Sequence, residues 1–305
     1  MKIKYLDLPL GPRKLAVIKQ ANAIIADYRR QGFDLTLRQL YYQFVARDLI
    51  PNRVQEYKRL GDIVNDGRLA GLIDWDAIVD RTRNLRLLAH WSSPGNIVES
   101  SAQQFRYDRW ATQPHRIEVW IEKDALVGVI EDVCDDLDVP YFSCRGYTSQ
   151  SEMWAASQRL KRYAQRPKNP QTPIILHFGD HDPSGIDMTR DIEDRLAMFM
   201  GGVEVRRLAL NMGQVNTFNP PPNPAKTTDS RYKSYIQLYG HESWELDALE
   251  PRVLAQLIRD EIDAVIDGDA WAEEDRRQLD ARSTLGQIAA RFDDVRDFLN
   301  TGESE

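Results

Sequence analysis

Apolar residues recur at helical spacing near the start of the chain, at Leu15, Ile18, Ala21 and Ile25. Thr36 suits the N-cap position of a second helix. From residue 73 the pattern changes to the two-residue period of a strand or hairpin arm. The expected elements are helices over residues 12–32, 36–48 and 53–72 and a strand over residues 73–83. Three helices followed by a β wing are the order of a winged helix-turn-helix.

After residue 115, strands alternate with helices. Strands are expected over residues 116–121, 139–144, 172–178 and 203–210, with a helix carrying Leu126, Ile130, Val133 and Leu137 and further helices over 149–165 and 184–200. This alternation predicts an α/β domain with a parallel sheet and helices on both faces. In such sheets, ligands bind at the carboxyl ends of the strands.

Breaks in the pattern divide the chain into segments. Ser92 to Gly95 form the first strong break, and the region up to Pro114 reads as a connector. A proline-rich loop occupies residues 219–224, and an acidic helical segment, expected to be a solvated appendage, begins at Pro251. The expected domains are residues 1–110, 115–250 and 251–305.

The 305-residue chain has a formal net charge of −7, but residues 1–116 carry +7 and the remainder −14. A basic first part suits contact with phosphate and an acidic second part suits cations, although two differently solvated surfaces explain the charges equally well. The first residues do not resemble a signal peptide, and no stretch approaches the roughly 20 apolar residues of a membrane span. We expect a cytoplasmic protein without membrane contact. Cys134 and Cys144 lack a disulfide or zinc-site pattern and are expected to be buried packing residues.

Three carboxylates follow expected strands. Glu122 ends the first strand, and Asp180 and Asp182 follow the third in the stretch HFGDHDPSG. Residues two apart in an extended chain point to the same side, so the two aspartates can converge. Such an oxygen-ligand set suits Mg²⁺ or Mn²⁺. The alternative is that the aspartates only shape the turn before the next helix, for which Ser184 is the expected cap.

These segments, VWIEKDAL, CRGYTSQS and ILHFGDHDPSG, together resemble the Toprim domain of topoisomerases, primases and some nucleases. The resemblance spans about residues 116–210. It implies a Rossmann-like fold in which Glu122, Asp180 and Asp182 bind Mg²⁺ where phosphodiester chemistry takes place.

The segment LTLRQLYYQFVARDLIPN contains a tyrosine pair. At about 100° per residue, Tyr41 falls on the apolar stripe of the helix, whereas Tyr42 lies outside it, one turn after Arg38. Tyr42 is therefore expected at a surface beside a cation, which would favour its phenolate as a nucleophile. Packing of two tyrosines on an amphipathic helix is the alternative.

An R-x-x-Y-Y motif ahead of a Toprim domain resembles the A subunit of topoisomerase VI, a type IIB topoisomerase, and the related protein that starts meiotic recombination. The resemblance covers about residues 30–250, and compact Mini-A proteins of phages and mobile elements are similar in length. It implies that Tyr42 attacks DNA and forms a 5′-phosphotyrosyl link, with Arg38 beside it. GYTSQS resembles the family's Gly-Tyr-Pro turn, with Thr148 where proline is usual.

Basic residues on the third helix and the wing are expected to contact DNA, as in other winged helices. The candidates are Arg53, Lys58, Arg59 and Arg68 on the helix and Arg81, Arg83 and Arg86 on the wing, with solvated surface charge as the alternative for each. Lys123, next to Glu122, could also reach a phosphate, but it is equally plausible as a surface lysine. Glu245 and Asp247, in the late segment, receive no chemical role.

Three functions remain open. The first is a DNA transesterase, for which cleavage alone, religation, relaxation and end fusion all stay open. Its family implies a twofold homodimer, and ATP-driven strand passage either needs a separate ATPase subunit or does not occur. The second is a Toprim nuclease that uses water and needs the acids but not Tyr42. The third is a DNA-binding protein without catalysis.

Overall fold

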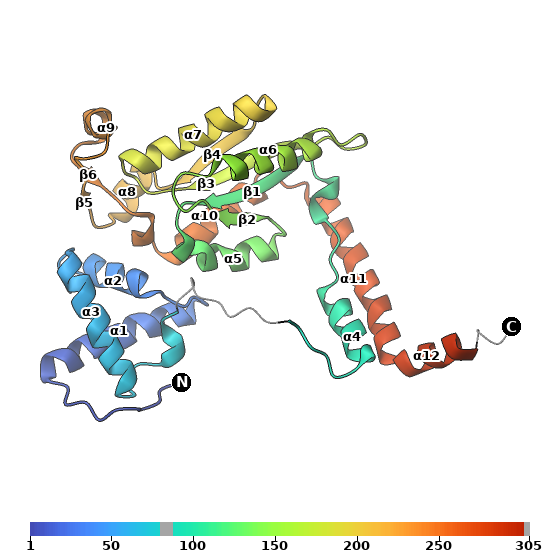
Figure 1. Cartoon of the computed structure of the whole chain (residues 1–305), viewed down its shortest axis with the longest axis horizontal. Helices are drawn as coiled ribbons and strands as arrows, with labels where there is room; N and C mark the ends of the chain where they lie inside the picture. Colours follow the sequence, from blue (N-terminus) through green and yellow to red (C-terminus); the bar gives the residue numbers. More distant parts are fainter. Residues whose placement is uncertain (80–87, 302–305) are drawn as a thin grey trace. The chain divides into compact units, whose positions relative to one another are not determined.

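The structure is a computed structural model that describes residues 1–79 and 88–301 (Figure 1). Its contacts form two compact units. The first comprises the described part of Met1–Arg83 with Ile117–Arg162 and Pro173–Asp263, and the second comprises the described parts of Asn84–Arg116 and Ala264–Glu305 with Tyr163–Thr172. These units cut across the three segments suggested by the sequence, and the three-domain division stays a prediction.

The three expected N-terminal helices are present as α1 (Pro12–Arg30), α2 (Leu37–Ala46) and α3 (Val54–Leu69). Thr36 caps α2 as expected, because its side chain accepts a hydrogen bond from the Gln39 amide while the Gln39 side chain accepts one from the Thr36 amide. The helices bury one apolar cluster whose largest members include Tyr28 and Phe44. Burial of these side chains is the main force that holds the helices together.

The strand expected over residues 73–83 is wrong for residues 73–79, its described part. This stretch contains the 3₁₀ helix η1 (Trp75–Ala77), and Ile78 makes only a single parallel bridge to Leu35. Asp74 caps η1 by accepting a hydrogen bond from the Asp76 amide at 2.9 Å. The short polar side chain thus stabilises a turn where alternation alone predicts extended backbone.

The parallel sheet and the α/β class are confirmed. The sheet contains β1 (His115–Ile121), β2 (Tyr141–Ser143), β3 (Thr172–Phe178) and β4 (Glu204–Ala209) in the order β2-β1-β3-β4. Val119 lies opposite Tyr141 across the β1–β2 pair, and Ile175 lies opposite Val205 across the β3–β4 pair. All four strands therefore end at one edge, which brings residues 122 and 180 near each other.

Helices cover both faces of this sheet (Figure 1). α6 (Gln150–Ala164) and α7 (Pro183–Met200) pack on the face that carries Trp120 and Ile175. α5 (Val127–Asp136) and α10 (Pro251–Asp263) pack against each other on the opposite face. Cys134 and Cys144 are buried and unpaired with each other, which confirms them as packing residues.

The remaining elements of the first unit lie near the carboxyl ends of the strands or link the main helices. They are η3 (Asp124–Leu126), α8 (Met212–Phe218), β5 (Asn223–Pro224), α9 (Tyr232–Tyr239), β6 (Glu242–Ser243) and η4 (Leu246–Ala248). β5 and β6 form an antiparallel pair, which brings the proline-rich loop beside the segment that leads into η4. This pairing sets the position of Glu245, between β6 and η4.

The second unit contains α4 (Pro94–Gln104), η2 (Arg109–Thr112), α11 (Gly268–Ala290) and α12 (Phe292–Thr301). The expected connector is thus partly helical: Ser93 caps α4, Pro94 occupies its first turn, and α4 packs along α11. In the same unit, Trp110 and Trp271 make an edge-to-face contact with ring centroids 5.5 Å apart.

The acidic end of the chain is helical as expected, but it is not wholly a solvated appendage. α10 buries Leu254, Ile258 and Ile262 completely in the first unit. The three residues recur every four positions and form one apolar face, which explains why this helix joins the core. Within the described ranges, no helix combines the length and apolar character needed to cross a membrane.

Candidate active site

Glu122 and Asp180 meet at the carboxyl ends of β1 and β3. The backbone amide of Glu122 donates to the Phe178 carbonyl at 2.8 Å, and its carboxylate accepts a hydrogen bond from the Asp180 amide at 2.8 Å. Both side chains are buried. Burial and then the negative charge of Asp180 raise the pKa of Glu122 to about 7, and burial also raises the pKa of Asp180 although Lys123 opposes it.

Asp182 is the N-cap of α7, and the expectation that Ser184 caps this helix is wrong. Asp182 Oδ1 accepts hydrogen bonds from the Gly185 amide at 2.6 Å and from Ser184 Oγ at 2.8 Å. Pro183 fits the first helical position, so the cap must precede it. One Asp182 oxygen is thereby committed to the helix, as the turn-and-cap alternative proposed.

Lys123 lies where three carboxylates converge. Its Nζ is 2.8 Å from Asp180 Oδ1, 2.9 Å from Glu245 Oε2 and 3.1 Å from Asp247 Oδ2. Only 18% of its side chain is exposed, so it is not a surface lysine. Burial would lower the pKa of Lys123, but Asp247 and the other two carboxylates raise it.

Arg38 of α2 pairs with two of the same carboxylates. Its Nε lies 3.0 Å from Asp247 Oδ2, and a guanidinium NH2 group donates to Glu245. Burial would raise the pKa of Glu245, but the charges of Lys123 and Arg38 prevail and lower it to about 2. The ion pairs therefore join the helix of the tyrosine motif to the strand-end acids of the same chain.

Tyr42 is buried, and its expected position at a surface is wrong in this structure. Its exposed fraction is 4%, close to the 5% of Tyr41, because the residues around η4 cover the helix. The Arg38 guanidinium lies 6.0 Å from the centroid of the Tyr42 ring, as the spacing predicts. Burial, and then Glu245, raise the pKa of Tyr42, while Arg38 and Lys123 act in the opposite direction.

Tyr41 is a core residue as expected, but its hydroxyl is also anchored. It donates to Asn52 Oδ1 at 2.9 Å and accepts from the Arg53 amide at 2.7 Å. Tyr41 and Tyr42 help to line a pocket of about 270 Å³ that Asn52 and Glu245 also border. The tyrosine pair thus faces a small space next to the acid cluster.

Arg207 of β4 is a contributor that the sequence did not reveal. Its two terminal nitrogens donate to the carbonyls of Gly179, Asp180 and Gly185 at 2.7–3.0 Å, and one of them also bonds Thr189 Oγ1 at 2.9 Å. Burial lowers the pKa of Arg207 to about 10. A buried guanidinium therefore fixes the backbone of the aspartate loop from beneath.

Glu245 and Asp247 are likewise missing from the expected site. Their two-residue spacing repeats that of Asp180 and Asp182, and this was the available signal. The Leu246 amide between them donates to Asp180 Oδ1 at 2.8 Å. This contact between η4 and the end of β3 places Glu245 and Asp247 at the site, and the local sequence does not predict it.

The expected DNA contacts differ in their surroundings. Arg53, Lys58 and Arg59 are exposed on or next to α3. Arg68 is half-buried, donates to the carbonyls of Trp75 and Ile78, and stabilises the turn after α3. Arg81, Arg83 and Arg86 lie outside the described residues.

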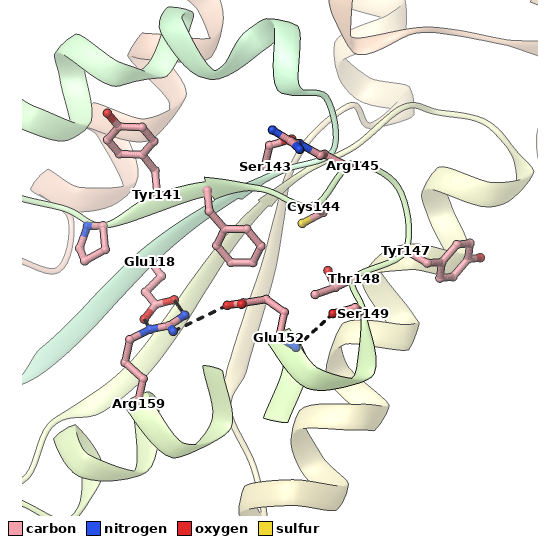
Figure 2. Close-up of a pocket in the computed structure, with 12 residues that line it drawn as sticks. Glu118, Tyr141, Ser143, Cys144, Arg145, Tyr147, Thr148, Ser149, Glu152 and Arg159 are labelled. Atoms are coloured by element: carbon pink, nitrogen blue, oxygen red, sulfur yellow. Dashed lines mark hydrogen bonds and ion pairs between the residues drawn. The ribbon is translucent and has the colours of Figure 1, made fainter. Parts of the chain in front are cut away.

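The GYTSQS turn shapes a second pocket rather than adding to the acid cluster. This pocket, of about 590 Å³, lies along β2, and Figure 2 shows Arg145, Tyr147, Thr148 and the Glu118–Arg159 ion pair around it. Gly146 has a φ of 87°, a conformation that glycine adopts without strain. Tyr147 donates to Asp187 on α7 at 2.6 Å and so ties the turn to that helix.

Within residues 1–79 and 88–301, no three histidine, cysteine or acidic side chains form a ready metal-ligand group. The carboxylate oxygens of Asp180, Glu245 and Asp247 surround the Lys123 ammonium instead. Comparisons with family models, with curated proteins and with solved structures found no match.

Proposed function

We propose that the protein cleaves double-stranded DNA by tyrosine transesterification, with Tyr42 as the nucleophile and Arg38 beside it. The observation that supports this proposal is the chain of ion pairs that links Arg38 through Glu245 and Asp247 to Lys123 and Asp180. Residues of the tyrosine motif and of the strand ends are far apart in sequence, and their meeting is what a shared reaction centre requires.

In this reaction the Tyr42 oxygen bonds to a DNA phosphorus while the bond from phosphorus to the 3′ oxygen breaks. The phenolic proton ends on the released 3′ hydroxyl, and a 5′-phosphotyrosyl link forms. Arg38 would bind the phosphate that Tyr42 attacks, because a guanidinium pairs well with phosphate oxygens. No water is consumed, so the link can be resealed.

The carboxylates Glu122, Asp180 and Asp182 are the proposed holders of Mg²⁺ or Mn²⁺. Hard oxygen donors at a strand edge fit such an ion chemically. When bound, the ion would stabilise negative charge on the phosphate oxygens. Arg207 keeps the loop that carries two of these carboxylates in shape through its bonds to the loop carbonyls.

The proposal includes a winged-helix and Toprim organisation, a homodimer, DNA contacts from α3, and a separate ATPase partner for any ATP-driven strand passage. The exposed Arg53, Lys58 and Arg59 support the α3 contacts. A dimer would bring two tyrosines to the two DNA strands.

A water-dependent DNA nuclease is the second candidate, and the burial of Tyr42 favours it. A phenol with a raised pKa that is 4% exposed is a poor nucleophile until α2 or η4 moves. The nuclease would use the strand-end acids and would not need the Tyr42 hydroxyl.

The test incubates supercoiled plasmid and Mg²⁺ or Mn²⁺ with wild type, Tyr42→Phe, Asp180→Asn and the control Tyr57→Phe, which changes another tyrosine of the same pocket. After a detergent quench, protein-linked DNA is expected with wild type and Tyr57→Phe and not with the other two. Cleavage by Tyr42→Phe at the wild-type rate, without linked protein, would establish the nuclease instead.

A further inference from the structure

We infer that Asp180, Glu245 and Asp247 form the divalent-cation site of this chain. The Lys123 ammonium occupies this site until a divalent cation displaces it. The inference rests on the proposed function, because it concerns the ligands of the same reaction centre. It replaces Glu122 and Asp182 by Glu245 and Asp247, two carboxylates that had no expected chemical role.

The convergence of charges carries the argument. Three carboxylates, one after β3 and two at the start of η4, each place an oxygen within 3.1 Å of a single nitrogen. A lysine ammonium is a compact point charge, and the oxygen atoms around it are of the type that Mg²⁺ and Mn²⁺ bind. Lys123 supplies one positive charge to three carboxylates, and Arg38 also pairs with two of them. A dication in place of the ammonium would balance the negative charge better.

A second, independent observation concerns the other oxygen of Asp247. This residue is 2% exposed, and its Oδ1 has no hydrogen-bond partner in the described part of the chain. A buried carboxylate oxygen without a partner is costly, and metal coordination is one way to satisfy it. Asp182 differs, because its Oδ1 already accepts two hydrogen bonds at the start of α7.

Exchange also gives Lys123 a use in the reaction. Once a dication takes its place, the ammonium can turn from the carboxylates to a phosphate oxygen at the same strand edge. Cation binding and DNA binding would then support each other.

The experiment measures Mn²⁺ affinity of the full chain without DNA, by electron paramagnetic resonance of the free ion. Lys123→Gln is expected to bind Mn²⁺ about tenfold more tightly than wild type, since the competing charge is gone. The matched control is Lys226→Gln, which removes an exposed lysine 3.8 Å from Asp182 Oδ2 and is expected to leave the affinity unchanged. A gain in affinity cannot result from unfolding.

Loss of ligands completes the test. Asp247→Asn and Glu245→Gln are expected to weaken Mn²⁺ binding at least tenfold, whereas Asp182→Asn and Asp187→Asn, an acid bound to Arg231 instead, are not. Unchanged affinity in Lys123→Gln together with strong loss in Asp182→Asn would refute the inference and leave the original ligands standing. Wild-type Mn²⁺ binding by Asp180→Asn would remove the cation site on which the proposed function itself depends.

Discussion

The phenol of Tyr42 is enclosed by Arg38 and Glu245, and this enclosure limits what the side chain can react with. The proposed reaction requires the Tyr42 oxygen to reach a phosphorus to within van der Waals contact, so it would require α2 and the residues around η4 to separate first. The arrangement described here is therefore a protected state of the tyrosine.

The first prediction tests this protection. Nitration by tetranitromethane should modify Tyr42 much more slowly than Tyr5 and Tyr147, which are 63% and 41% exposed. Peptide mass spectrometry at short reaction times measures the three sites in one sample. Equal nitration of Tyr42 and Tyr147 would show that the enclosure does not persist in solution.

The second prediction concerns His177 on β3. Burial and then Arg207 lower the pKa of this fully buried imidazole to about 3, so the unfolded chain binds a proton below pH 6.5 that the folded chain does not. Acid therefore destabilises the fold: from pH 7.5 to 5 this group should reduce the free energy of unfolding by about 2 kcal/mol.

Urea denaturation at several pH values measures the effect. His177→Asn, which retains a polar atom near the position that bonds Thr189 Oγ1, should flatten the pH dependence. The exposed His90→Asn is the control and should leave it unchanged. An unaltered slope in His177→Asn would assign the acid sensitivity to other groups.

At the scale of elements, β3 and α7 could be predicted within a residue because an apolar run and a proline turn mark their ends. The structure of residues 73–79 could not be predicted, because apolar and polar residues alternate both in strands and in half-buried turns. The helix α4 was missed for a related reason: only Ala102 of it is buried, so its sequence has little apolar pattern. Its contact with α11 supplies the stabilisation that the local sequence lacks.

The third prediction tests the turn between β3 and α7. A Cβ at Gly185 would overlap the carbonyl oxygen of Asp180, so Gly185→Ala should destabilise the fold by about 1–3 kcal/mol. A Cβ at Gly213 in α8 would meet no atom within 4 Å. Gly213→Ala should therefore be neutral or should stabilise the fold by up to about 1 kcal/mol. Thermal unfolding compares the two, and equal stability of both variants would contradict the tight approach.

Across the whole molecule, charge is distributed so that the basic first part and the strand-end acids meet through a few ion pairs. The sequence indicated this division, and it indicated Glu122, Asp180 and Arg38. It did not indicate Lys123 as the centre of the cluster, because its partners Glu245 and Asp247 are more than 100 residues away and nothing local specifies that contact.

The fourth prediction belongs to this scale. Changing Arg53, Lys58 and Arg59 together to glutamine should lower the slope of log affinity against log salt for duplex DNA by about 2–3, since each phosphate contact contributes about 0.9. The control changes Arg190, Arg276 and Arg296, which are 56–71% exposed. Fluorescence anisotropy at several salt concentrations gives both slopes, and equal slopes would exclude α3 from the DNA interface.

The hydrogen bonds of Arg207 determine how variants of Asp180 and Asp182 can be interpreted. Most of its bonds go to main-chain carbonyls, so they do not depend on which side chains stand at positions 180 and 182. Amide variants there should leave the loop path unaltered and change only its charge. Functional defects in such variants can then be attributed to the lost charge, because the backbone conformation of the loop stays the same.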